Sequence, residues 1–298
     1  MDLRTGFQDL NGEGQAAAPV HSKELVSEAL SRQLERKEIE LPLLPQVSSQ
    51  VLTMAGDDRS SAAKLSKIIH QDQALAGNVL KVANSAAFGG RTAIVSLQQA
   101  IARLGMNPLR EIALSLSVKG HLFQAPGYES VVRSIWRHAL ASGIYAKEIA
   151  RMRRRNVEIG FLCGLLHAIG KPLVLGAISR IEKQLGLRLG RIQVLQLLDD
   201  FHPSFGARLA EEWGLPEQVR ESIKWCESYR QAPAFAEDAE NTFVAGLLAT
   251  HCLSPGTFEE EEFRNHQAFR DLNLYPDDIE RLILRGPTVV ERVEALAL

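Results

Sequence analysis

The sequence predicts an all-α protein. Apolar residues recur at helical spacing along most of the 298-residue chain, and no segment shows the sustained period-two alternation of a half-buried strand. Residues that cap helices stand at the start of several of these segments, as Asp72, Ser96 and Asn107 do. Hydrophobic residues make up 45% of the chain, which is enough to bury an ordinary core.

Prolines and capping residues mark the expected helices in the first half of the chain. Residues 1–21 are expected to form a disordered tail, and an amphipathic helix is expected from Ser22 onward. Pro45 suits the first turn of a short helix, and Asp72 and Ser96 suit the N-cap positions of later ones. The helices expected here cover residues 22–34, 45–55, 62–70, 72–83, 96–104, 107–123 and 130–151.

Glycines and prolines set the expected boundaries in the second half. Residues 156–175 are expected to form one helix, whose glycines permit close contact with other helices. His202 and Pro203 are expected to begin a helix, and residues 214–216 make a sharp break. The helices expected here cover 156–175, 192–198, 203–213, 216–226, 242–252, 277–284 and 287–298, with residues 258–269 irregular or weakly helical.

Charge and cysteine usage narrow the classes of function. With 34 basic and 36 acidic residues the net charge is −2, which gives no case for a nucleic-acid binder. Cys163, Cys226 and Cys252 form neither a CxxC motif nor a disulfide framework, so a reducing compartment is expected. The sequence indicates no signal peptide and no apolar stretch of membrane-spanning length. We therefore expect a cytoplasmic protein without a membrane partner.

Three histidines fall on successive expected helices. His138 lies on an apolar stripe in the middle of a helix, His167 stands between Leu166 and Ala168, and His202 precedes a proline. Each one alone is typical of a core or capping histidine. A carboxylate directly after His167 would give a divalent cation a second ligand, whereas the methyl group of Ala168 coordinates nothing.

Two regions of the chain resemble known families. Residues 69–89, including Asn84-Ser85, and residues 94–105 resemble the signature region of the HDOD family. Residues 136–138 and 166–171 resemble the core of the HD phosphohydrolase superfamily, to which HDOD proteins are related. The resemblance spans about residues 41–226. It implies a multi-helix HD-like core with added N-terminal and C-terminal helices: an HDOD domain with an N-terminal helix over 22–236 and a helical C-terminal extension over 237–298.

The resemblance also implies that the metal site of the active enzymes is degenerate. In those enzymes a first His, a His-Asp pair and a later Asp bind metal. His138 and His167 match the two histidines, Ala168 stands in place of the first Asp, and no Asp lies in residues 245–252. We therefore expect no metal, no other cofactor and no catalytic residue. If a metal were held, its ligands would be His138, His167 and His202.

Further positions match the related cyclic-dinucleotide phosphodiesterases only in part. His202 lies where those enzymes carry an additional histidine, but Trp225 and Cys226 stand near the place of their His-His pair. Lys171 matches a lysine that contacts substrate phosphate in such enzymes. The alternative interpretation of Lys171 is a cation at the end of a helix.

These observations predict a non-catalytic bacterial signal-transduction module that works by binding. The implied partners are signalling proteins, namely a kinase, a response regulator or a cyclic-dinucleotide enzyme, and self-association is left open. One alternative is a divergent metal-dependent phosphodiesterase that uses the three histidines. Another is a sensor of a small anion or nucleotide, with His138, His167, Lys171 and His202 forming a remnant pocket.

A partner surface is expected in residues 41–123. Asn84, Ser85 and Phe88 are the candidate contact residues, because they belong to the segment that distinguishes this family from the enzymes. The structural alternative is that the first two end a helix and that Phe88 closes the following turn. An exposed Phe88 would favour a hydrophobic anchor for a partner, and a buried one would favour the turn.

Overall fold

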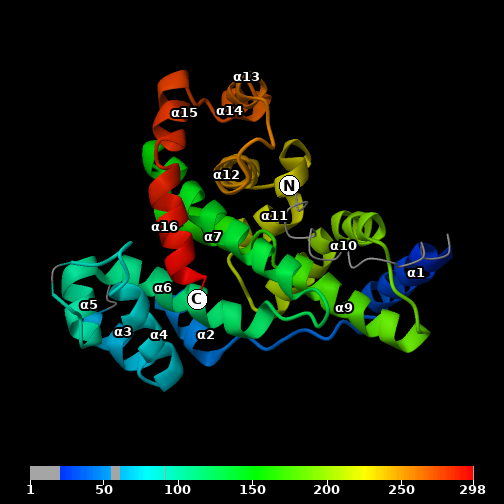
Figure 1. The fold of residues 1–298 in the computed structure, drawn as a ribbon, viewed down its shortest axis with the longest axis horizontal. Helices are drawn as coiled ribbons and strands as arrows, with labels where there is room; N and C mark the ends of the chain where they lie inside the picture. The colour runs from blue at the N-terminus through cyan, green and yellow to red at the C-terminus, as the bar shows by residue number, and fades with distance from the viewer. Residues whose placement is uncertain (1–20, 55–60, 91, 298) are drawn as a thin grey trace. The chain divides into compact units, whose positions relative to one another are not determined.

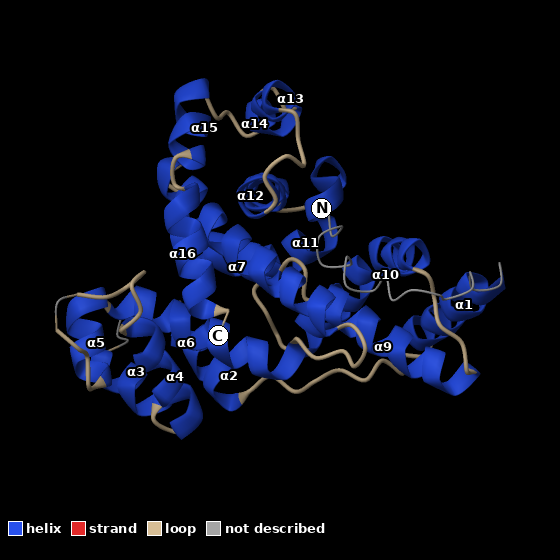
Figure 2. Ribbon diagram, viewed as in Figure 1, coloured by secondary structure: helices blue, strands red, loops and turns tan. Residues whose placement is uncertain are grey.

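The computed structural model describes residues 21–54, 61–90 and 92–297, and its regular elements are helices (Figure 2). No strand occurs within these ranges, which confirms the predicted fold class. The expected tail, apart from its last residue, lies outside the described residues. That last residue, His21, is already the first residue of a helix.

The chain divides into two units, whose helices are labelled in Figure 1. Unit 1 comprises residues up to Leu41 and residues 123–286, and unit 2 comprises residues 42–122 and 287–298. Unit 1 contains helices α1 (His21–Glu35), α7 (Glu129–Met152), α8 (Val157–Leu166), α9 (Gly170–Leu185), α10 (Arg191–Glu212), α11 (Glu217–Trp225), the 3₁₀ helix η2 (Cys226–Gln231), α12 (Ala236–Leu253), α13 (Glu260–Arg264), α14 (Gln267–Asp271) and α15 (Pro276–Ile283). Unit 2 contains α2 (Gln46–Met54), α3 (Ala62–Ile69), α4 (Gln73–Ala83), α5 (Leu97–Leu104), α6 (Met106–Leu122) and nearly all of α16 (Gly286–Leu296).

Unit 2 is organised around α6, which packs against α2, α3, α4 and α5. The predicted caps are present, because the Asp72 side chain accepts a hydrogen bond from the backbone N–H of Leu75 and the Ser96 side chain accepts one from Gln99. The C-terminal helix belongs here as well. Lys119 Nζ donates to the carbonyl oxygen of Ala297 over 3.0 Å. The expected extension of residues 237–298 is therefore divided between the two units.

Unit 1 is organised around α7, which packs against both α8 and α12. The residues of α7 are buried on nearly every face of the helix. In the rest of the unit α9 packs against α10, α10 against α11, and α11 against α12. Helix α1 covers α9 and α10. Two predicted boundaries in this unit are wrong, and both bear on the site.

The first wrong boundary is the single helix expected over 156–175. The chain forms two helices instead, and the break at residues 167–169 places His167 directly after the end of α8. The second is the helix start expected at His202, which lies inside α10 with Pro203 following it in the same helix. Phe201, Phe205 and Leu209 are buried on either side of the proline, and this burial outweighs the backbone hydrogen bond that Pro203 cannot make.

Two glycines bring the helices of the site into close contact. A Cβ atom on Gly164 would lie 2.4 Å from the carbonyl oxygen of Ser142 in α7, so only glycine lets α8 approach so closely. A Cβ atom on Gly170 would lie 1.9 Å from the carbonyl oxygen of His202 in α10. The first contact draws His167 toward α7, and the second draws the start of α9 onto His202.

The stretch Val157–Leu185 corrects one expectation from the sequence. By length and composition alone it could cross a membrane, since an 18-residue window within it has a mean hydropathy of 1.7. In the structure this stretch is α8 and α9, and 94% of the window is buried inside the protein. Its apolar character is therefore accounted for by core packing.

Replacing Gly170 with alanine is expected to lower the free energy of unfolding by about 3 kcal/mol or more, because the added Cβ overlaps the His202 carbonyl. Gly176→Ala in the same helix is the matched control. Its Cβ would meet the end of the Arg180 side chain at 3.7 Å and the carbonyl oxygen of Gln124 at 4.0 Å, both ordinary contacts, so it should stabilise the protein by about 0.5–1 kcal/mol. Urea denaturation measures both effects, and equal unfolding midpoints for the two variants would contradict the packing described.

Candidate functional site

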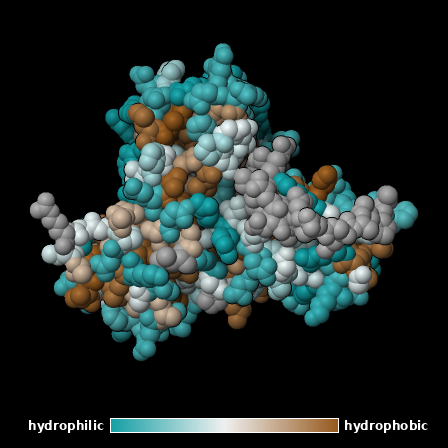
Figure 3. Space-filling view, viewed as in Figure 1, coloured by the Kyte–Doolittle hydropathy of each residue, from teal (hydrophilic) through white to brown (hydrophobic). Residues whose placement is uncertain are grey.

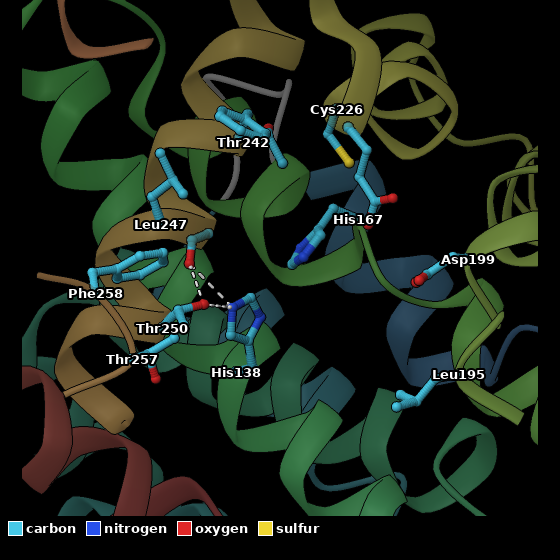
Figure 4. A pocket seen from close by; sticks show the side chains of 13 residues that line it. His138, His167, Leu195, Asp199, Cys226, Thr242, Leu247, Thr250, Thr257 and Phe258 are labelled. Atoms are coloured by element: carbon cyan, nitrogen blue, oxygen red, sulfur yellow. Dashed lines mark hydrogen bonds between the residues drawn. The ribbon is translucent and has the colours of Figure 1, made fainter. Parts of the chain in front are cut away.

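A pocket of about 480 Å³ in unit 1 contains the candidate site (Figure 4). Residues of α7, α10, η2 and α12 line it, together with His167 at the end of α8 and the segment that follows α12. Of the predicted site residues, His138 and His167 line this pocket. Lys171 and His202 contact the pocket-lining residue Glu227.

The rings of His138 and His167 lie side by side, with centroids 5.6 Å apart and planes inclined by 58°. Their proximity follows from the tight packing of α8 on α7 at Gly164. We expected these two side chains to lie on facing helices within reach of one another, and the structure brings them together.

Hydrogen bonds fix which ring nitrogen carries the proton. His138 Nε2 lies 3.1 Å from the carbonyl oxygen of Gly246, and His167 Nδ1 lies 2.7 Å from that of Gly164. A carbonyl oxygen can only accept, so the proton sits on Nε2 in His138 and on Nδ1 in His167. The free lone pair of the His167 imidazole is therefore on Nε2. The His167 ring points toward the pocket (Figure 4).

Burial keeps both imidazoles neutral. It lowers the pKa of His138 well below its ordinary value, with His167 and Lys171 adding to the effect. Burial likewise lowers the pKa of His167 to about 4, despite the hydrogen bond to Gly164. At neutral pH the pocket therefore contains two uncharged histidines rather than an anion-binding pair.

The charge of Lys171 is compensated inside the protein. Its side chain is only 1% exposed, and its Nζ lies 3.3 Å from Oε1 of Glu227. The same oxygen accepts a hydrogen bond of 3.1 Å from His202 Nε2. Burial opposes ionisation of Glu227, but the bond from His202 and the charge of Lys171 outweigh it and hold the Glu227 pKa well below its usual range. Burial, assisted by Lys171, lowers the pKa of His202 to about 4.

These residues do not fit the metal of the HD enzymes. Ala168 is fully buried and offers no ligand atom, and the Nε2 atoms of His138 and His202 are occupied as hydrogen-bond donors. An ammonium group beside Glu227 also repels a cation. Within the described ranges, no group of three or more His, Cys, Asp or Glu side chains is placed to hold a metal ion.

Sequence reasoning missed several residues of the pocket. Glu227 directly follows Cys226, but one glutamate in a polar segment carries no distinguishing signal. Asp199 lines the pocket from α10, and burial raises the pKa of its carboxyl group. Thr250 lies 3.1 Å from His138 Nε2 and comes from α12. Nothing in the sequence distinguishes Thr250 as a pocket residue, and from the sequence that helix bears on the site only through the absence of an aspartate ligand.

The candidate partner residues lie in unit 2, around one turn. The Asn84 side chain bonds both the N–H and the carbonyl of Ile94, at 2.7 and 2.8 Å, and so closes the loop between α4 and α5. The carbonyl of Ser85 accepts from Phe88 N–H. The Phe88 ring is half-buried and lies 5.6 Å from the guanidinium carbon of Arg292. Asn84 thus has a structural role, and partner binding by Phe88 stays a prediction.

The Glu227→Gln substitution should lower the free energy of unfolding by about 1–3 kcal/mol, because the buried Lys171 ammonium loses its counter-charge. The loss is no larger because the Glu227 side chain is partly exposed to solvent. Adding Lys171→Met should recover most of this loss. The exposed Glu217→Gln on α11 is the control and should change stability by less than about 0.5 kcal/mol. Chemical denaturation of these variants measures the coupling free energy between Glu227 and Lys171. A double variant less stable than Glu227→Gln alone would contradict the charge compensation described.

The buried histidines should make the protein sensitive to acid. His167 and His202 have pKa values lowered from 6.5 to about 4, so between these limits the unfolded chain binds protons that the folded chain does not. The free energy of unfolding should therefore fall as the pH falls from 6.5 to 4, by about 1.4 kcal/mol per pH unit for each histidine. Glu227 adds to the loss only below the ordinary pKa of a glutamate, 4.5.

Urea unfolding across this pH range measures the slope. His202→Gln keeps a side-chain N–H for Glu227 but cannot titrate, and it should reduce the slope by about one proton. A profile that stays flat below pH 6.5, or a slope unchanged in this variant, would show that these imidazoles are not buried as described.

Comparisons with known proteins agree with this fold. Residues 41–229 match the family model described as the HDOD domain. A protein of Treponema pallidum (strain Nichols), named only "Uncharacterized protein", is 28% identical over 202 residues. The match covers 64% of this chain and 39% of that protein, so the chain spans about two fifths of its relative's length.

Three crystal structures share the fold. An HDOD domain protein with unknown function from Geobacter sulfurreducens aligns with a TM-score of 0.69 and 20% identity, over 92% of this chain and 97% of that one. A "Putative metal-dependent phosphohydrolase" from Shewanella amazonensis aligns with a TM-score of 0.67 and 19% identity, over 91% of this chain and 98% of that one. A "Putative signal transduction protein" from Marinobacter aquaeolei aligns with a TM-score of 0.67 and 18% identity, over 95% of this chain and 68% of that one.

At these identities the three likenesses show the fold alone. The family model covers more than half of the chain, but it is narrower than the expected domain of residues 22–236 at both ends. The turn around Asn84 lies within the matched residues, and the described part of the chain there is helical. On this evidence, the chain belongs to the HDOD domain family.

Proposed function

We propose that this HDOD protein is a non-catalytic signal-transduction module that works by binding rather than by turnover. The observation that carries the proposal is the donor set of the pocket. Ala168 replaces the ligand that metal-dependent hydrolysis needs, and Lys171 sits where its charge opposes a second cation. A pocket that retains its shape without this chemistry can still select a ligand.

The remaining groups would also be poor catalysts of phosphate ester hydrolysis. Such a reaction needs a cation to acidify water and to screen the phosphate. His138 and His167 are neutral and hydrogen-bonded to backbone carbonyls, and Glu227 is held ionised by Lys171. None of these three groups is poised near neutral pH as a general acid or base.

Two further observations support a signalling role. One structural neighbour, from Marinobacter aquaeolei, is named a "Putative signal transduction protein". The family assignment points the same way, and we propose that partners are other signalling proteins of a bacterial cytoplasm. The three free cysteines, Cys163, Cys226 and Cys252, agree with a reducing compartment.

The protein should show no turnover of cyclic dinucleotides or of p-nitrophenyl phosphate esters in the presence of manganese, iron or magnesium. The physical reason is the missing carboxylate beside His167. Ala168→Asp alone should remain inactive, because Lys171 still opposes the metal and no second acid follows in α12 at residues 245–252.

An active HD-domain phosphodiesterase assayed in parallel shows that the conditions permit turnover. His167→Ala, checked for folding by circular dichroism, is the matched variant. Metal-dependent hydrolysis by the wild-type chain that disappears in this variant would overturn the proposal and establish a divergent enzyme.

A further inference from the structure

The polar side chains of the pocket share one property: they present hydrogen-bond acceptors. The hydroxyl groups of Thr242, Thr250 and Thr257 donate to the backbone carbonyls of Asp238, Gly246 and Ser254 at 2.8, 3.0 and 2.8 Å. Their protons are therefore used within their own segments. What each hydroxyl can offer a ligand is a lone pair.

The two histidines show the same polarity. His138 directs its N–H to the Gly246 carbonyl, with the Thr250 hydroxyl also 3.1 Å away. His167 directs its N–H to Gly164 and leaves the lone pair of Nε2 on the pocket side. Among the described lining side chains, each N–H or O–H proton is already donated within the protein. The exception is the Cys226 thiol, which is a weak donor.

The formal charges that line the pocket are negative. Asp199 and Glu227 are the described lining residues with ionisable carboxyl groups, and no lysine or arginine of residues 21–54, 61–90 or 92–297 lines the pocket. Lys171 does not line the pocket, and its ammonium group pairs with the lining residue Glu227. Figure 4 shows Asp199 and His167 directed toward the same space, with Thr250 on its other side.

The remaining lining is apolar and held in place by neighbouring rings. Leu195, Leu247, Phe243 and Phe258 contribute side chains to it. Phe243 packs against Tyr229 at 5.2 Å between ring centroids, and Phe258 packs against Phe263 at 5.5 Å. Aromatic walls near carboxylates favour an organic cation, which gains from charge pairing and from contact with the rings.

We propose that this pocket binds a small organic cation, a primary ammonium group carried on an apolar or aromatic body. The ammonium supplies the hydrogen-bond donors and the positive charge that the lining lacks. A volume of about 480 Å³ lies within the range of small-molecule sites and far exceeds that of one metal ion. The inference rests on the proposed binding function and names its ligand class; it argues against the anion or nucleotide considered from the sequence.

Phenethylammonium is the probe, and two isosteres without a positive charge are its controls: 2-phenylethanol and 3-phenylpropanoate. Each is titrated into the full chain and followed by NMR. Phenethylammonium should shift the resonances of His167, Phe243 and Phe258 saturably and bind at least about tenfold more tightly than the alcohol, because its contacts are charge-assisted. The carboxylate should bind most weakly. A carboxylate that binds most tightly would overturn the assignment, and so would no binding of any probe.

Asp199→Asn tests the charge without disturbing the core. It should weaken phenethylammonium binding by about threefold to tenfold. Asp200→Asn is the matched control, since Asp200 is the next residue on α10, is also exposed and does not line the pocket. Equal affinities in the two variants would contradict the site. So would saturation of the same resonances by zinc or manganese alone at lower concentrations than phenethylammonium requires.

These outcomes are separate from the fate of the proposed function. Metal-dependent turnover would end the claim that the protein is non-catalytic. Failure of the ammonium titration in a chain without turnover would remove only the ligand class.

Discussion

The buried ammonium group of Lys171 determines the chemistry of the candidate site. With 1% of its side chain exposed, this group requires a counter-charge, and Glu227 supplies it. That pairing in turn orients His202, which donates to the same oxygen of Glu227. Burial, with the charge of Lys171 adding to it, lowers the pKa of His202 and His167 and keeps both uncharged. A buried positive charge therefore lies beside the pocket that the two histidines line, and its partner Glu227 is one of the lining residues.

The backbone packing of two helix pairs places these groups. The contact of Gly164 with α7 brings His167 beside His138, and the contact of Gly170 with α10 brings Lys171 near His202. Neither approach leaves room for a side chain at the glycine. The shape of the pocket thus depends on helix packing rather than on coordination bonds.

Much of this arrangement follows from local sequence signals. Helical periodicity with caps at Asp72 and Ser96 was sufficient for the fold class, since both caps form as expected. The family resemblance paired His138 with His167 because it aligned both with one ancestral site. Pro203 was misinterpreted as a helix start, because the burial of Phe201 and Phe205 that keeps α10 continuous depends on tertiary contacts. Glu227 and Thr250 are not predicted from the sequence, for the same reason: long-range packing, which leaves no local pattern, brings them to the pocket.

The metal content of the full chain, purified without added metal and without chelators, tests most directly whether this pocket retains metal. We expect substoichiometric amounts of zinc, iron, manganese and nickel, unchanged in His167→Ala. One equivalent of any of these metals in the wild-type protein, lost in His167→Ala, would contradict the account.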